Sequence, residues 1–226
     1  MNNSLELLTG RYTKHLKEYN DFLLTSSTIE AFLNLKALAK KEIGADLQII
    51  SAFRNFEKQK NIWQLKTEGK RKVFDDYDQI VDLSKYTPIE KCFKILRFSA
   101  LPGLSRHHWG TDIDIFDANK LSKKNVQLLP SEWNEGSAFF ELGNWLTEKI
   151  KNKQAYGFFR PYSQDLGGIH PEPWHLSFEP ESSLYFEQYT SEIFNQHLKC
   201  SDFNFIDIIE KNKNDIFNKF FLSISS

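Results

Sequence analysis

The spacing of apolar and polar positions predicts a chain of several helices with a few short strands between them. Residues 5–23 place leucines and tyrosines on one side at helical intervals, which predicts a first helix. Ser27-Thr28-Ile29-Glu30 has the form of a capping box, and Gly44 is placed to end the helix that would follow it. Residues 47–51 are apolar and rich in β-branched side chains, so we expect a strand there.

The middle of the chain alternates predicted helices with loops. Asn55 can cap a helix with an apolar face. Residues 66–86 are charged and have no periodic pattern, which predicts a loop or an insertion. Thr87-Pro88-Ile89-Glu90 predicts a further helix start, with proline in the first helical position. Another helix is expected from about residue 137 to about 152, followed by a strand at 156–159.

Two polar segments are predicted to lie on strands. Asp112-Ile113-Asp114-Ile115-Phe116 would direct its isoleucines to the core and both aspartates to the opposite face. Gly110 lets the chain turn just before this strand. Residues 174–178 are expected to form another strand. Because Glu172 lies three residues before His175, a twist or bulge is needed to bring their side chains to one side.

These elements predict an α+β protein with a small, mostly antiparallel sheet flanked by helices and a helical C-terminal extension. The composition changes near residue 180, and residues 182–199 and 203–221 are expected to form two helices rich in Phe, Ile and Leu. We therefore divide the chain into residues 1–180 and 181–226. We favour packing of the extension onto the core over an exposed surface for a partner or a second copy.

Composition and charge narrow the class of partner. The 226 residues are 40% hydrophobic and 26% charged with a formal net charge of −1, which gives no reason to expect nucleic acid. No stretch reaches the length of a transmembrane helix, and the first residues lack the pattern of a secretory signal. We expect a cytoplasmic protein, or a periplasmic or envelope protein whose signal was removed. Cys92 and Cys200 follow no metal-binding spacing; a buried free thiol at Cys92 is favoured over a disulfide.

Two segments carry the candidate chemistry. The first is Ser105-Arg106-His107-His108-Trp109-Gly110-Thr111-Asp112-Ile113-Asp114, and the second is Glu172-Pro173-Trp174-His175. Together they supply two imidazoles and one carboxylate for a metal, with one carboxylate left for acid–base work. A hydrolytic zinc site has this composition, because it uses three protein ligands and keeps one position open for water.

The two segments resemble the VanY-type D-alanyl-D-alanine carboxypeptidases. The shared patterns are Ser-x-His-x-x-Gly-x-x-x-Asp followed by Glu-x-Trp-His, preceded by Pro102-Gly103 and by Ser51-Ala52-Phe53-Arg54 with Gln59. The resemblance covers residues 47–180 with the motifs in the family order. This family belongs to a zinc peptidase superfamily that also includes VanX-type dipeptidases and L,D-carboxypeptidases of cell-wall metabolism.

The resemblance implies a role for each matching residue. It makes His107, Asp114 and His175 the zinc ligands and Glu172 the catalytic base. Arg54 would bind the substrate's terminal carboxylate or assist at the developing oxyanion. Two neutral residues, Gln59 and Ser105, would also orient the peptide.

One position, Asp112, departs from the family pattern, which has a small residue there. Its carboxylate could bind a cationic substrate group, support a metal ligand from behind, or compete as a ligand. His108 and His170 neighbour the motifs but match no motif position, so we expect them outside the site. Trp109 and Trp174 are expected to form walls of the cleft.

The function implied is that of a zinc carboxypeptidase that removes a terminal D-alanine from peptidoglycan stem peptides. The bond could be D,D in a pentapeptide or L,D in a tetrapeptide, and a D,D-dipeptidase is an alternative. A binding module that keeps the metal but lacks turnover is a further alternative. We favour the enzyme because all four chemical residues are present. The missing signal favours a soluble precursor or a recycled fragment as substrate over the intact wall.

Overall fold

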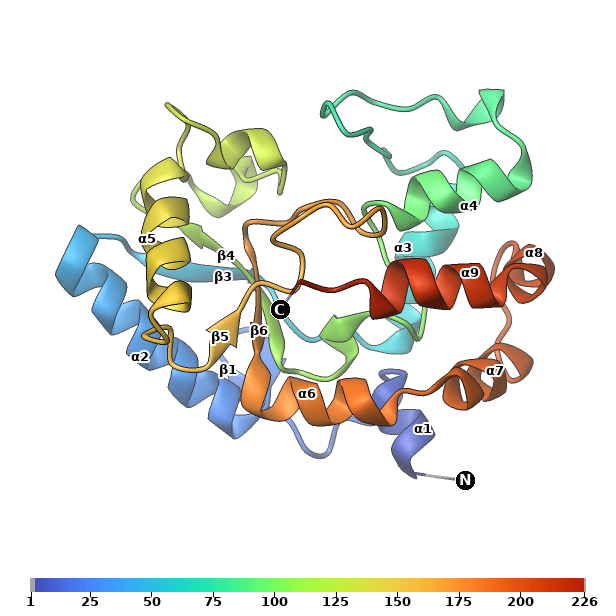
Figure 1. Cartoon of the computed structure of the whole chain (residues 1–226), viewed down its shortest axis with the longest axis horizontal. Coiled ribbons are helices and arrows are strands. Elements are labelled where there is room, and N and C mark those ends of the chain that lie inside the picture. The colour runs from blue at the N-terminus through green and yellow to red at the C-terminus, as the bar shows by residue number, and fades with distance from the viewer. Residues whose placement is uncertain (1–2, 226) are drawn as a thin grey trace.

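The computed structural model describes residues 3–225, so the outer limits of the two predicted segments, residues 1 and 226, lie outside the described residues. It confirms the α+β class (Figure 1). The main sheet has the strand order β3-β4-β6-β5, and every neighbouring pair in it is antiparallel. The strands are β3 (Leu47–Ser51), β4 (Asp112–Asp117), β5 (Phe158–Phe159) and β6 (His175–Phe178).

The sheet packs against two helices, α2 (Ser26–Ile43) and α5 (Phe140–Lys151), in one apolar core. Ile113 and Ile115 of β4 are fully buried in this core, as their alternation with aspartates predicts. The N-cap of α2 is Thr25, whose side chain accepts from the amide of Thr28. The predicted capping box, which begins at Ser27, therefore placed the helix start two residues too far along the chain. Gly44 ends α2 with φ 68°, as expected.

The predicted helix over residues 5–23 is wrong beyond its first turns. Helix α1 spans Asn3–Leu8 and is followed by a hairpin of β1 (Lys17–Tyr19) and β2 (Phe22–Leu24). Two residues break the helix: Gly10 has φ 75°, and Asn20 in the hairpin turn has φ 53°. Glycine and asparagine tolerate this left-handed backbone, which is incompatible with a continuing helix.

Helices α3 (Phe56–Thr67) and α4 (Pro88–Leu96) begin where their caps predict. The Asn55 side chain accepts from the amide of Lys58, and Thr87 and Glu90 form the reciprocal capping box. Between the helices the chain forms a loop with one isolated bridge, Phe74 to Ile80, and a short 3₁₀ turn at Leu83–Lys85.

The C-terminal segment contains more and shorter helices than predicted. These are α6 (Glu179–Gln188), α7 (Ser191–Lys199), α8 (Ile206–Lys211) and α9 (Lys213–Phe217), followed by a π-helical turn over Asn218–Leu222. The first predicted helix is divided because Thr190 caps α7 by accepting from the amide of Ile193. The second is divided at Asn212, which ends α8.

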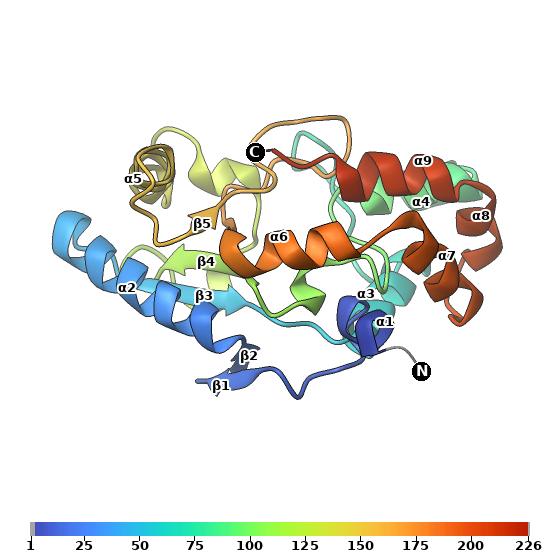
Figure 2. The ribbon, with the colours of Figure 1, turned by 60° about the horizontal axis from the view of Figure 1, so that its bottom comes forward.

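The C-terminal helices share a second apolar core with α3 and α4. Residues from both sides of position 180, such as Trp63, Leu96, Phe194 and Ile216, are buried together in it. Figures 1 and 2 show these helices on one side of the molecule and the main sheet with α2 and α5 on the other. The extension therefore packs on the helices that precede the metal-binding motif, while the boundary at residue 180 stays a prediction.

The extension also holds the turn that leads to the first motif. The Tyr189 hydroxyl donates to the carbonyl of Gly103 at 2.7 Å, and His197 Nε2 lies 2.7 Å from the carbonyl of Pro102. A side chain on Gly103 would meet the His197 ring at 2.2 Å, and Gly103 has φ 86°. Only glycine fits this close approach, so helix α7 and the Pro102-Gly103 turn are matched to one another.

Among residues 3–225, no helix combines the length and the apolarity that crossing a membrane requires. Within the same residues Cys92 and Cys200 are both free thiols. Cys92 is buried, as predicted, and burial raises the pKa of its thiol to about 12. This cysteine is therefore an unreactive core residue.

Replacing Tyr189 by phenylalanine tests the contact between the extension and the Gly103 turn. We expect the free energy of unfolding to fall by about 1–2 kcal/mol, because the buried Gly103 carbonyl loses its donor. Urea denaturation of both proteins measures the change. Tyr156→Phe, at a tyrosine that is 45% exposed, is the matched control and should change stability by much less. Equal effects of the two substitutions would contradict this account.

Candidate active site

Strand pairing and one short helix bring the predicted metal ligands together. Asp114 on β4 lies directly opposite His175 on β6, so both side chains leave the same face of the sheet. His107 lies on the 3₁₀ helix Arg106–His108, and its carbonyl accepts from the amide of Arg54 at 3.1 Å. Three side chains suited to metal binding, each from a separate segment of the chain, thus meet at one point.

A bulge in β3 sets the chain beside Asp114. Ile49 pairs with Ile115 and Ser51 with Asp114, which leaves Ile50 as an extra residue on β3. Such a bulge bends the strand end and re-aims the residues that follow it. Those residues include Ala52, whose carbonyl contacts His107, and Arg54.

A turn, rather than a twisted strand, brings Glu172 and His175 to the same side. The amide of His175 donates to the carbonyl of Glu172 at 3.0 Å, and β6 begins only at His175. Trp174, predicted as the first strand residue, belongs to this turn. The amide of Glu172 donates to the carbonyl of Tyr162, which fixes the start of the turn.

The three predicted ligands form a compact, buried group. His107 Nε2 lies 3.3 Å from Asp114 Oδ2, and His175 Nδ1 lies 3.3 Å from Asp114 Oδ1. One donor atom from each residue lies within 4.8 Å of the others. Glu172 Oε2 is 3.1 Å from His175 Nδ1. The Glu172 side chain is 16% exposed, whereas that of His175 is 3% exposed.

In His107 and His175, the ring nitrogen that faces away from Asp114 contacts a hydrogen-bond acceptor. His107 Nδ1 is 3.0 Å from the carbonyl of Ala52, and His175 Nε2 is 3.0 Å from Asp112 Oδ1. An imidazole that donates from one nitrogen presents a lone pair on the other. His107 Nε2 and His175 Nδ1 are therefore the nitrogens available to a metal.

The same nitrogens and one carboxylate oxygen lack hydrogen bonds. Within residues 3–225, His107 Nε2, Asp114 Oδ1 and His175 Nδ1 are buried polar atoms without a hydrogen-bond partner. Buried polar atoms are normally paired, so three such atoms directed at one point indicate a missing partner. Two nitrogens and one oxygen fit a metal with an open fourth position.

Burial and charge act differently on the two histidines. Burial, and next the nearby Arg54 guanidinium, lower the pKa of His107, which favours the neutral, metal-binding form. Burial alone would also lower the pKa of His175, but the carboxylates of Asp112, Asp114 and Glu172 hold it well above its usual range. In the absence of a metal, these carboxylates favour the protonated form of His175.

Asp112 lies behind His175 and not in the cleft. It is fully buried, and its oxygens accept from Arg106 Nε at 2.9 Å and from the Thr111 hydroxyl at 2.7 Å, besides contacting His175. Burial would raise the pKa of Asp112, but Arg106 and His175 hold it well below its usual range. Of the three roles that the sequence leaves open, this position favours support of a metal ligand.

Arg54 reaches the cleft, whereas Gln59 and Ser105 lie behind it. Gln59 is fully buried; it accepts from Arg54 Nη1 at 3.0 Å and donates to the carbonyl of Ala100 at 2.7 Å. Ser105 is 3% exposed. Arg54 lines the cleft with Asp114 and Glu172, and burial lowers its pKa without making the guanidinium neutral near pH 7.

The other residues named from sequence lie near the site or in the core. Burial lowers the pKa of His108 to about 3, and its ring links the carbonyl of Arg54 to the amide of Gly103. His170 stacks on Phe98. Trp174 lines the cleft, as expected of a wall, whereas Trp109 is buried in the helical core.

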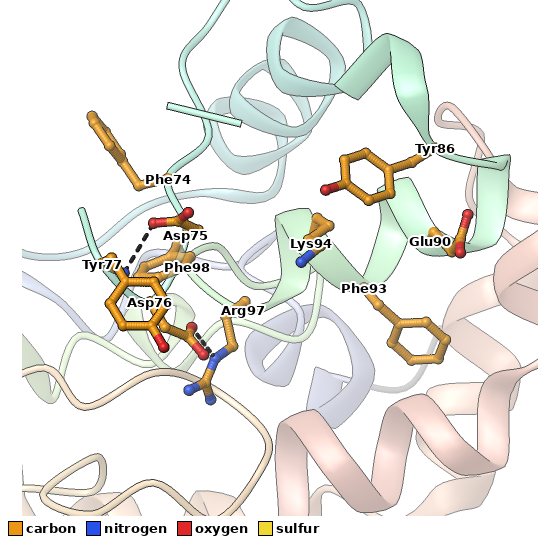
Figure 3. A pocket seen from close by; sticks show the side chains of 10 residues that line it. All are labelled: Phe74, Asp75, Asp76, Tyr77, Tyr86, Glu90, Phe93, Lys94, Arg97 and Phe98. Carbon is orange, nitrogen blue, oxygen red and sulfur yellow. Dashed lines mark hydrogen bonds and ion pairs between the residues drawn. The ribbon is translucent and has the colours of Figure 1, made fainter. Parts of the chain in front are cut away.

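The cleft in front of the ligands has a volume of about 330 Å³, and a second hollow of about 540 Å³ adjoins it. Phe74 and Phe98 line both. In the second hollow Arg97 is directed at Asp76 (Figure 3). Arg97 also pairs with Asp165. The Arg97 charge is thus paired with acidic neighbours, and aromatic rings from several segments form the walls.

Comparison with known proteins agrees with this combination of an antiparallel sheet, a His-Asp-His group and a neighbouring glutamate. The model of the VanY family, described as D-alanyl-D-alanine carboxypeptidase, matches residues 21–181. The chain therefore belongs to the VanY family. An uncharacterised protein of Haemophilus influenzae is 34% identical over 119 residues, which are 51% of this chain and 88% of that protein.

Two solved structures share the fold. VanYB in complex with D-alanine-D-alanine is 19% identical with a TM-score of 0.54, over 85% of this chain and 92% of that one. A mutant of the vancomycin-resistance D,D-pentapeptidase VanY in complex with Zn(II) is 20% identical with a TM-score of 0.50, over 75% and 83%. Because these structures are only 19% and 20% identical to this chain, their similarity shows a shared fold and no further property.

Sequence reasoning missed Arg106, although it lies inside the first motif. Arg106 is 3% exposed, contacts Asp112, and donates from Nη2 to the Ser177 hydroxyl at 2.6 Å. Asp112 could have indicated this role for Arg106, because a buried aspartate needs a cation or several hydrogen-bond donors beside it. Tyr162 was also missed; its ring lies 5.0 Å from that of His175, and no motif marks it.

Replacing Asp112 by asparagine should weaken metal binding without removing a ligand. We expect zinc affinity to fall roughly 10- to 100-fold, because the His175 ring loses its charged acceptor. Competition with a chromophoric chelator measures the affinity of the folded variant. Asp117→Asn, at a buried aspartate on the same strand that caps other amides, is the control. If both variants bind zinc as the wild type does, Asp112 does not support the ligand.

Zinc affinity should rise with pH because the metal displaces the His175 proton. The pKa of His175 is higher in the folded protein than in the unfolded chain, so protonated His175 stabilises the metal-free fold. This stabilisation is complete below the unfolded-state pKa of about 6.5 and is lost as pH rises through the folded-state pKa. Calorimetry at pH 6, 7 and 8 in buffers of different ionisation enthalpy should show that zinc binding releases protons. A zinc affinity that is equal at pH 6 and pH 8 would contradict this expectation.

Proposed function

We propose that this protein is a zinc-dependent carboxypeptidase that removes a terminal D-alanine from peptidoglycan stem peptides. The observation that carries the proposal is the convergence of His107, Asp114 and His175, whose donor atoms lie within 4.8 Å of one another. Glu172 stands beside them at the cleft. Membership of the VanY family, described as D-alanyl-D-alanine carboxypeptidase, supports the reaction.

Zinc is the metal that the donors support. Two imidazole nitrogens and one carboxylate oxygen are a frequent catalytic zinc set, and the VanY mutant structure of the same fold holds Zn(II). A zinc ion bound there would polarise the scissile carbonyl and lower the pKa of water toward neutrality. His107, Asp114 and His175 would hold it, with Asp112 keeping the His175 ring in place.

Glu172 is the residue that we assign to proton transfer. Its carboxylate can accept a proton from the attacking water and deliver it to the departing amine. The turn between Glu172 and His175 holds the base next to a ligand, and the contact of its amide with Tyr162 limits its freedom. A fixed base avoids the entropy cost of orienting a mobile one during the reaction.

Arg54 is the residue that we assign to the substrate's terminal carboxylate. The guanidinium can form two parallel hydrogen bonds with a carboxylate. Gln59 accepts from one side of Arg54, which leaves Nε as a buried donor without a partner among the described residues. We therefore assign Gln59 and Ser105, both behind the cleft, to positioning rather than to direct substrate contact.

Mass spectrometry of two muropeptides tests the reaction. A pentapeptide and a tetrapeptide form are incubated with zinc-loaded protein and, in parallel, with protein treated with a chelator. Metal-dependent loss of one alanine from the pentapeptide supports a D,D-carboxypeptidase, and loss from the tetrapeptide supports an L,D-carboxypeptidase. If neither peptide changes while zinc is bound, the proposal is wrong.

Glu172→Gln should separate metal binding from catalysis. We expect zinc to bind with an affinity near that of the wild type, while alanine release falls by at least about a hundredfold because no base remains. Glu179→Gln, at an exposed glutamate in the first turn of α6, is the matched control and should keep full activity. Undiminished alanine release by Glu172→Gln would remove Glu172 from the mechanism.

A further inference from the structure

The cleft is lined by far more positive than negative charge. Its cationic lining residues are Arg54, Lys58, Lys66, Arg71 and Lys72, and its acidic ones are Asp114 and Glu172. The whole chain has a formal net charge of −1, so the excess is local. Both acids are assigned to metal binding and proton transfer. The remaining cations are therefore not accounted for by the site.

Two of these cations lie on one stripe of helix α3. Lys58, Ile62 and Lys66 are four residues apart, so their side chains lie on the same side of the helix, and all three line the cleft. Lys60, on the same helix, is not among the lining residues. Arg71 and Lys72 come from the chain just beyond α3 and line the cleft together with this stripe.

These cations have no counter-charges of their own. In the part of the chain that the structure describes, no ion pair joins Lys58, Lys66, Arg71 or Lys72 to an acidic side chain. In the adjoining hollow, by contrast, Arg97 is paired with two aspartates. Exposed lysines are ordinarily solvated, but several cations that converge on a concave surface attract an anion.

Among these cations, Lys66 is too buried for water to solvate its ammonium group fully. It is 8% exposed, although buried lysines are rare without a partner. Burial, and next the nearby Arg71 and Arg54, lower the pKa of Lys66 to about 7. The C-terminal end of α3 supplies only partial negative charge to it. An anion in the cleft would supply the full counter-charge.

We propose that the cleft takes a peptide with a second anionic group besides its C-terminal carboxylate, and that Lys58, Lys66, Arg71 and Lys72 bind this group. The inference rests on the proposed carboxypeptidase function, in which Arg54 binds the terminal carboxylate. The second group is a carboxylate on a residue upstream of the cleaved bond, or a phosphate attached to the amino end of the peptide. Both present oxygens with the geometry that arginine and lysine bind.

Three synthetic peptides distinguish these sources. All end in D-Ala-D-Ala: one carries a free side-chain carboxylate upstream, one carries the corresponding amide, and one is the amide peptide with a nucleoside diphosphate at its amino end. We expect kcat/KM to be about tenfold or more higher for one or both anionic peptides than for the amide. The preference should shrink at 0.5 M salt, because exposed charges are then screened over a few ångströms.

Two variants test the residues. Arg71→Gln with Lys72→Gln removes exposed charges, and Lys66→Met removes the buried one. In each we expect the ratio of kcat/KM for the anionic peptide to that for the amide peptide to fall toward one. Lys60→Gln removes one charge from the same helix outside the cleft and should keep the wild-type ratio. The exposed double variant keeps the test valid if Lys66→Met does not fold.

Binding measurements separate this inference from the proposed reaction. Zinc-loaded Glu172→Gln is titrated with the same three peptides by calorimetry, so no turnover is needed. Tighter binding of an anionic peptide, lost in the double variant, supports the inference even if no peptide is hydrolysed. Equal binding and equal kcat/KM for all three peptides overturn it, while alanine release from them would leave the carboxypeptidase proposal intact.

Discussion

A buried ion pair between Arg106 and Asp112 joins the segments that carry the candidate metal ligands. Arg106 precedes His107 in its 3₁₀ helix, and Asp112 begins the strand that carries Asp114 and also contacts His175. Removing one partner of such a pair leaves an uncompensated buried charge, which typically costs about 3–5 kcal/mol. The pair therefore constrains all three ligands at once, and aromatic rings around Arg106 exclude water from it.

The cleft is lined by groups of both charges. Asp114 and Glu172 supply carboxylates, and Arg54, the lysines of α3 and the chain that follows α3 supply cations. In the proposed reaction, these cations would attract the anionic groups of a peptide while its scissile carbonyl lies at the candidate metal site. Orientation of this kind contributes to rate without any additional contact at the reacting atoms.

The sequence predicted those features that short-range chemistry decides. The cap at Asn55 was predicted correctly because neighbouring residues determine it, and the three residues predicted as metal ligands lie close together in the structure. The first predicted helix failed because Gly10 and Asn20 admit a left-handed backbone that apolar spacing does not reveal. Burial of Gln59 behind the cleft, and the pairing of Arg106 with Asp112, depend on contacts between distant segments, which local patterns do not encode. The fold class and the residues of the candidate metal site could therefore be predicted from the sequence, whereas the contacts behind those residues could not.

The contact between the C-terminal helices and the Pro102-Gly103 turn has a consequence for the order of events during synthesis. Tyr189 and His197, which hold this turn, are translated after every residue of the metal-binding group. While the chain is still on the ribosome, the loop that carries His107 lacks this support. The last helices to emerge complete the setting of the site, so a nascent chain truncated before them would lack a fully supported centre.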